Sequence, residues 1–175
     1  MADKTITALT AATTPLAGTE VVPLVQGGTT KKATVNDIKF NTAPTFSAYL
    51  GTNQTVSTGQ TKITLNTELW DTNSNYDNAT NYRFTPTVAG YYQVNWYANT
   101  TSSTSLLQCS IYLNGTNVAA GSEPTTGNAS QVAALIYMNG STDYIEFYFY
   151  AGVGGGTVAA GRANTCASAI WVRGA

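Results

Sequence analysis

Histidine is absent from this 175-residue chain, and charged residues make up only 10% of it. Without histidine the chain lacks the commonest general base near neutral pH and the commonest metal ligand, so Ser-His and Cys-His nucleophiles are excluded. A typical soluble domain is about 25% charged. Solubility therefore rests on the hydroxyls and amides of Thr, Ser and Asn. The net charge is −1 and the basic residues are scattered, so no nucleic-acid partner is expected.

Cysteine is almost as scarce, since Cys109 and Cys166 are the only two. Each lies in a strand-like apolar run, without Cys or His neighbours at the spacing of a zinc site. We expect two buried thiols, with a disulfide as the lesser alternative in a reducing cytosol. No apolar run reaches the ~18 residues of a membrane span, and the N-terminus lacks the regions of a secretory signal. We therefore expect synthesis in the cytoplasm, no membrane insertion and no cofactor.

Carboxylates are the remaining source of catalytic groups. A pair of them is the minimum for glycoside cleavage, and Glu68 and Asp143 are the candidates for a glycan depolymerase. The segment Asp71–Asp77 is rich in oxygen ligands but lacks the central Gly and closing Glu of an EF-hand loop, so a solvated turn is favoured. The favoured expectation is that the protein is not an enzyme.

Residues of high strand propensity (Thr, Val, Ile, Tyr, Phe and Trp) dominate the chain. From Phe46 onward, apolar segments alternate with clusters of Gly, Asn, Asp, Ser and Thr, the pattern of a β-sandwich or barrel. Successive side chains of a strand point to opposite faces, so one face of each strand is predicted to be buried. The clearest alternation places six residues in the core: Tyr92, Val94, Trp96, Ile145, Phe147 and Phe149.

Two Asn-Gly pairs predict hairpin turns, because both residue types tolerate the positive φ of a type I′ turn. They are Asn114-Gly115 and Asn139-Gly140. The strands beside each turn are then predicted to pair, Leu107–Leu113 with Asn117–Gly121 and Gln131–Met138 with Tyr144–Tyr150.

The same alternation directs four tyrosines away from the core: Tyr91, Tyr97, Tyr148 and Tyr150. A large aromatic face on a chain so poor in charge is expected to be covered, because such patches mark interfaces. Self-association around a symmetry axis is the favoured interpretation, with these four tyrosines at the oligomer interface. The alternative is a sugar-binding surface on which tyrosine rings stack against pyranose faces.

The first 42 residues differ from the rest and have no aromatic residue before Phe40. Two short β-like pieces, Glu20–Val25 and Ala33–Val35, flank a turn signal at Gln26–Thr29 and predict a small hairpin. A short helical turn is predicted at Val35–Ile38. We expect residues 1–42 to be a separate segment and residues 43–175 to be the head domain.

The motif Leu65-(x5)-Asp71-(x4)-Tyr76 … Phe84-(x5)-Gly90-Tyr91-Tyr92-Gln93-Val94-Asn95-Trp96-Tyr97 resembles the signature of the globular head of complement component 1q, a relative of the tumour necrosis factor jelly roll. The resemblance covers residues 46–175. It implies an all-β, ten-stranded antiparallel jelly-roll sandwich that assembles as a homotrimer and has no enzymatic activity. It also implies that Phe84 is a core residue.

Residues 6–38 resemble the N-terminal segment of many bacteriophage tail-fibre and other virion proteins, in which a short β-hairpin precedes diverse C-terminal domains. The resemblance implies that residues 1–42 attach the trimer to capsid or tail proteins. The residues expected to make this attachment are apolar: Leu16, Val21, Val22, Leu24, Val25, Val35 and Ile38.

Together the two resemblances imply a structural protein of a phage particle, made in the host cytoplasm and displayed on the virion. It is expected to be a homotrimeric surface knob, short fibre or capsid decoration protein. The alternative is a tail-fibre host-adhesion protein that binds a cell-surface glycan through its loops. Gly152–Gly156 and Pro124–Asn128 are the candidate loops for that role.

Overall fold

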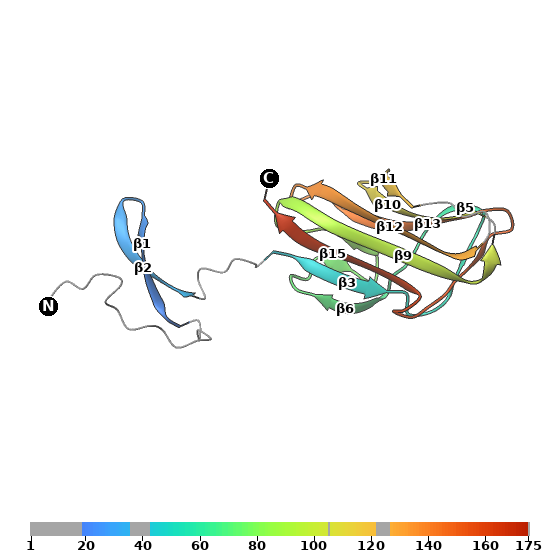
Figure 1. The fold of residues 1–175 in the computed structure, drawn as a ribbon, viewed down its shortest axis with the longest axis horizontal. Coiled ribbons are helices and arrows are strands. Elements are labelled where there is room, and N and C mark those ends of the chain that lie inside the picture. The colour runs from blue at the N-terminus through green and yellow to red at the C-terminus, as the bar shows by residue number, and fades with distance from the viewer. Residues whose placement is uncertain (1–18, 36–42, 105, 122–126, 175) are drawn as a thin grey trace. The chain divides into compact units, whose positions relative to one another are not determined.

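The computed structural model describes residues 19–35, 43–104, 106–121 and 127–174 (Figure 1). The chain divides into two compact units, Met1–Thr42 and Ala43–Ala175. Regular structure in the described residues consists of strands, and these residues include no helix long and apolar enough to cross a membrane.

The first unit contains a β-hairpin. Strand β1 (Val21–Gln26) pairs antiparallel with β2 (Thr29–Thr34), from Val21 opposite Thr34 to Gln26 opposite Thr29. The turn consists of Gly27 and Gly28, with φ of 59° and 74°, so it needs the conformational freedom of glycine at both positions. The predicted hairpin is confirmed. Its second strand begins at Thr29 and not at Ala33 as expected, because the two-residue turn allows pairing to start directly after it. The helical turn predicted at Val35–Ile38 lies outside the described residues from position 36 onward.

The head is a sandwich of two antiparallel sheets, of seven and six strands. Most strands of the larger sheet follow the order β12-β9-β15-β3-β6, with β14 and β4 continuing from one end of β9. Figure 1 shows the long β9 between β15 and β12. The strands of this sheet are β3 (Thr45–Tyr49), β4 (Gln54–Val56), β6 (Thr67–Asp71), β9 (Gly90–Thr104), β12 (Gly127–Met138), β14 (Gly156–Val158) and β15 (Thr165–Arg173).

The smaller sheet has β13 at its centre. Strand β10 pairs with one edge of β13, and β5 and β8 pair with the other. Its strands are β5 (Gly59–Lys62), β7 (Tyr76–Asp77), β8 (Arg83–Phe84), β10 (Leu107–Leu113), β11 (Thr116–Ala120) and β13 (Ile145–Ala151).

The inner faces of the two sheets form one aromatic core. Phe46 stacks on Tyr76 and Phe84 at centroid distances of 4.7 and 4.6 Å, and Trp96 lies 5.6 Å from Phe147. The seven residues assigned to the core from the sequence are each at most 1% exposed: Phe84, Tyr92, Val94, Trp96, Ile145, Phe147 and Phe149.

The two Asn-Gly pairs behave differently. At Asn114-Gly115 both residues have positive φ, 51° and 79°, and the predicted hairpin of β10 with β11 is confirmed. The pairing predicted for Gln131–Met138 with Tyr144–Tyr150 is wrong, because β12 pairs with β9, and β13 pairs with β10. The Asn139 Oδ1 accepts backbone N–H groups from Ser141, Thr142 and Asp143. Asn139 therefore holds a wider loop that crosses between the sheets.

Candidate functional site: the outer faces of the two sheets

The four outward-pointing tyrosines do not share one face. Tyr91 and Tyr97 lie on β9 of the larger sheet, whereas Tyr148 and Tyr150 lie on β13 of the smaller sheet. Because the inner faces of the sheets meet in the core, the two pairs lie on opposite outer surfaces of the sandwich. The expectation that the four tyrosines share one face is therefore wrong. Alternation along a strand predicts which side chains point away from the core, but it does not predict the sheet to which the strand belongs.

The outer surface of β12, β9, β15, β3 and β6 is called the large-sheet face here. Tyr137 lies opposite Tyr91 across the β12-β9 pair, and their rings meet edge to face at 5.5 Å. Leu135 and Ile170 both lie opposite Gln93, from the strands on either side of it. Six large hydrophobic residues of this face are between 36% and 59% exposed: Trp70, Tyr91, Leu135, Tyr137, Ile170 and Val172.

The large-sheet face is also poor in charge. Strands β3, β9 and β12 contain no Asp, Glu, Lys or Arg, and β15 contains only Arg173 near its end. The carboxylates lie at the edge of the face, on β6, where Glu68 is exposed. Among the described residues of the head, Val118 and Val153 are the only other exposed large hydrophobic residues. A concentrated apolar patch of this kind is typical of interaction surfaces.

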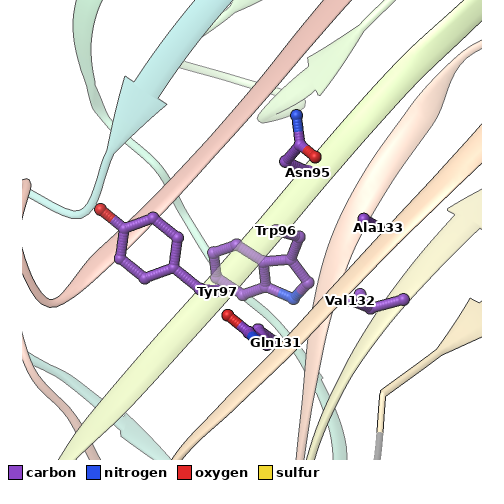
Figure 2. A pocket seen from close by; sticks show the side chains of 6 residues that line it. All are labelled: Asn95, Trp96, Tyr97, Gln131, Val132 and Ala133. Carbon is purple, nitrogen blue, oxygen red and sulfur yellow. The ribbon is translucent and has the colours of Figure 1, made fainter.

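A hollow of about 320 Å³ lies on the large-sheet face between β9 and β12 (Figure 2). Its outward-pointing lining comes from Asn95 and Tyr97 on β9 and from Gln131 and Ala133 on β12. Figure 2 shows the Tyr97 ring to one side of the hollow. The Tyr97 hydroxyl donates a hydrogen bond to the backbone carbonyl of Arg162, which fixes the ring. Because Ala133 is small, the hollow has room for one side chain from outside.

Most of these residues were not identified from the sequence, although a signal was present. In β12 the inward residues Ala134, Ile136 and Met138 alternate with the outward residues Leu135 and Tyr137. A strand that is apolar on both faces is covered on both faces. That pattern indicates a second buried surface in addition to the core.

The two carboxylates expected to serve a depolymerase have different settings, since Asp143 lies in a turn and Glu68 lies on a strand. The two oxygens of Asp143 accept hydrogen bonds from the Asn114 side chain and the Asn139 backbone, both at 2.8 Å. Backbone N–H groups, chiefly those of Thr80 and Ala79, hold the pKa of Asp77 far below its usual range. Partial burial raises the pKa of Glu68, but Glu68 lies on β6 of the larger sheet and Asp143 precedes β13 of the smaller one.

The two cysteines are free and buried, Cys109 on β10 and Cys166 on β15. Neither belongs to a metal site. Within the described ranges, no group of three or more His, Cys, Asp or Glu side chains is placed to hold a metal ion.

The outer surface of β11, β10, β13, β5 and β8 is called the small-sheet face here. Its centre carries Tyr112 and Tyr148, whose rings lie 4.1 Å apart at an angle of 31°. Beside them Lys62 donates a 2.5 Å hydrogen bond to Glu146 in an ion pair. This surface therefore combines aromatic rings with an ion pair at its centre.

Of the two candidate glycan loops, the one that is described in full offers little to a sugar. Gly152–Gly156 exposes Val153, which is 87% accessible, but carries no aromatic or charged side chain. The loop Pro124–Asn128 lies partly outside the described residues. A sugar site is therefore better sought on a sheet face.

The N-terminal hairpin presents apolar side chains without a core of its own. Val21, Val22 and Val25 are exposed, and Leu24 and Val35 are half-buried. Leu16 and Ile38, also expected to contribute to attachment, lie outside the described residues.

Comparison with known proteins identifies the fold. No model of a known protein family matches the chain, and no curated protein is significantly similar to it. Among solved structures, the globular domain of zebrafish complement 1qA matches with a TM-score of 0.55 and 15% identity, over 75% of this chain and 99% of that one. Murine APRIL matches with a TM-score of 0.60 and 8% identity, over 74% and 99%. Eiger TNF from S. frugiperda matches with a TM-score of 0.50 and 11% identity, over 75% and 95%.

These likenesses define the class of the head. It is an all-β, antiparallel jelly-roll sandwich with the fold of the complement 1q and tumour necrosis factor domains. The predicted fold class is confirmed. At identities of 15% and below, the match establishes the fold alone.

Proposed function

We propose that this protein is a homotrimeric surface component of a bacteriophage particle, a knob, short fibre or capsid decoration protein. Residues 1–42 attach the trimer to capsid or tail proteins, and the jelly-roll heads face the solvent. The virion assignment is supported by the resemblance of residues 6–38 to phage virion segments. The trimer is supported by the jelly-roll fold and by the chemistry of the large-sheet face.

The observation that carries the trimer is the concentration of exposed apolar side chains on the large-sheet face. Leu135, Ile170 and Tyr137 project from neighbouring strands of a surface whose central strand β9 is uncharged. In a threefold ring each copy turns this surface toward the axis, and different parts of it contact the two neighbours. The uncharged strands β9 and β12 at its centre bury no unpaired charge in that contact, which would be costly. The hollow beside Ala133 receives a side chain of the neighbouring copy.

This proposal revises the interface expected from the sequence. Tyr91 and Tyr97 lie within the large-sheet face and belong to the subunit contact. Tyr148 and Tyr150 lie on the opposite surface and remain exposed in the assembly.

Molecular mass in solution tests the trimer. The wild-type chain is expected to sediment at three times 18.4 kDa. Replacing Leu135 and Ile170 together by Asp places charges in the contact, and the variant is expected to sediment as one chain. Val118→Asp is the matched control, because Val118 is 45% exposed on β11 of the other sheet. A monomeric wild type, or a double variant that stays trimeric, contradicts this interface.

Electron cryomicroscopy of the intact particle tests the virion role. Density for the trimer on the capsid lattice indicates decoration or stabilisation of the shell. Density only at the tail or baseplate indicates a fibre for host adhesion. Absence from purified particles contradicts both.

A further inference from the structure

Three cross-strand rows of side chains cross the small-sheet face. Each row has one tyrosine with hydrogen-bonding side chains beside it. Each row runs from β10 through β13 to β8 or β5. The first row is Tyr112, Glu146 and Arg83, the second is Ser110, Tyr148 and Lys62, and the third is Gln108, Tyr150 and Gln60. On the large-sheet face, by contrast, three exposed aliphatic side chains, Leu135, Ile170 and Val172, lie among the aromatic ones.

The hydroxyl groups of the tyrosines in these rows are not used by the fold. Three other tyrosine hydroxyls of the head are used by it: those of Tyr76, Tyr92 and Tyr97 donate to the backbone carbonyls of Leu65, Val88 and Arg162. Within the described residues, the hydroxyls of Tyr112, Tyr148 and Tyr150 make no hydrogen bond. All three side chains are only half-buried. Their rings and hydroxyls are therefore available to a ligand.

The polar groups beside the tyrosines are held in place, and the two charges at the centre of the face, Lys62 and Glu146, form an ion pair. The ammonium of Lys62 lies against Oε1 of Glu146, which is 8% exposed. The other carboxylate oxygen of Glu146, Oε2, accepts no hydrogen bond among the described residues. Gln60 donates from Nε2 to the Ser110 hydroxyl at 3.1 Å, which leaves its carbonyl oxygen as an acceptor. The guanidinium of Arg83 lies 4.4 Å over the Tyr144 ring.

A ligand that fits this surface needs apolar faces for the rings and many neutral hydroxyls for the polar groups. Aromatic rings contribute a large contact area at little entropic cost, and a few fixed polar groups give orientation. Because Lys62 and Glu146 neutralise each other, the centre of the face does not favour a polyanion. A pyranose ring meets both needs, since it has a C–H face and hydroxyls around its edge.

We propose that the small-sheet face binds a neutral oligosaccharide, with pyranose rings stacked on Tyr148 and Tyr150 and Tyr112 beside them. Glu146 and Gln60 accept hydrogen bonds from sugar hydroxyls. This inference goes beyond the structural role proposed above and does not depend on it, because the small-sheet face lies opposite the trimer contact. It places a host-adhesion function on a sheet surface, away from the loops.

Saturation-transfer NMR on the full chain tests the site. The probes are hexasaccharides of glucose, mannose, galactose and N-acetylglucosamine, with hexagalacturonate as the acidic comparison. At least one neutral probe is expected to receive saturation at its C–H protons, and hexagalacturonate is not. Binding to none of the neutral probes at millimolar concentration, or only to the uronate, overturns the proposal.

Substitutions then locate the binding surface. Tyr148→Ala is expected to weaken binding at least about tenfold, as loss of about 1.4 kcal/mol of contact would. Tyr148→Phe keeps the ring and is expected to bind within about threefold of wild type, which separates lost stacking from misfolding. Val153→Ala, at a side chain that is 87% exposed in the loop between β13 and β14, is the control and is expected to bind as wild type. Unchanged binding by Tyr148→Ala overturns the site. A normal trimer mass in the same sample shows that only this inference has failed.

Discussion

The indole of Trp96 on β9 donates a 2.9 Å hydrogen bond from Nε1 to the backbone carbonyl oxygen of Tyr148 on β13. The bond spans the core and joins the strand that carries the proposed subunit contact to the strand that carries the proposed sugar site. The largest core side chain, which is 1% exposed, therefore sets the spacing of the two sheets by a directed bond as well as by packing.

Trp96→Phe is expected to lower the free energy of unfolding by about 2–4 kcal/mol. The change removes the indole N–H that donates a hydrogen bond to the backbone carbonyl oxygen of Tyr148, and it leaves a cavity beside Phe147. Urea unfolding followed by circular dichroism measures the effect. Val118→Ala, at an exposed site, is expected to stay within about 0.5 kcal/mol of wild type. Equal stability of the two variants would show that the bond across the core contributes nothing.

Gly140→Ala is expected to destabilise the head far more than Gly154→Ala. Both glycines have left-handed backbone, with φ of 71° and 90°, so both substitutions cost about 1 kcal/mol in strain. A Cβ at Gly140 would lie 2.3 Å from the backbone nitrogen of Ala89, whereas a Cβ at Gly154 meets open space. The difference in melting temperature between the variants therefore measures the close approach of this loop to the turn before β9. Equal melting temperatures would contradict that packing.

The same loop shows where sequence reasoning succeeds and where it stops. Alternation along Tyr92–Trp96 and Ile145–Phe149 identified buried residues, because facing inward is a local property of a strand. The Asn114-Gly115 hairpin was predictable for the same reason, since both residues adopt positive φ. At Asn139 the side chain accepts three backbone N–H groups instead. The adjacent strands then enter different sheets, and no local pattern distinguishes that outcome.

The candidate site was predictable only in part for a related reason. Tyr91 and Tyr148 both point outward, but assigning them to opposite surfaces requires the partners of β9 and β13. Those pairings join residues far apart in sequence, as between Tyr92 and Ile136. Sheet membership is decided by the long-range fit of strands, which pattern alone does not contain.

The stability of the head is expected to fall as pH rises above 9, in part through Cys109. Burial raises the pKa of this thiol from 9.0 to about 12. Between these values the unfolded chain loses a proton that the folded chain keeps, so stability present below pH 9 is lost as pH approaches 12. The slope for one such proton is about 1.4 kcal/mol per pH unit.

Cys109→Ser isolates that contribution, because serine does not titrate in this range. The unfolding free energy, measured in urea from pH 8 to 10.5, is expected to fall less steeply with pH in the variant than in wild type. Some slope remains, since burial also raises the pKa of Tyr92 to about 12. Parallel curves for variant and wild type would show that the Cys109 thiol titrates alike in both states.

Removal of residues 1–42 is expected to separate folding from attachment. Every residue of the described core cluster lies at or beyond Phe46, within the unit Ala43–Ala175. The shortened chain is expected to melt within about 2 °C of the full chain, a difference of less than about 1 kcal/mol. It is also expected to keep the trimer mass, because the large-sheet face is intact, yet to be missing from particles assembled in its presence.

Val21→Asp with Val25→Asp in the full chain tests the same point without deletion, since both side chains are exposed on β1. Normal incorporation of either variant would place the attachment in the head.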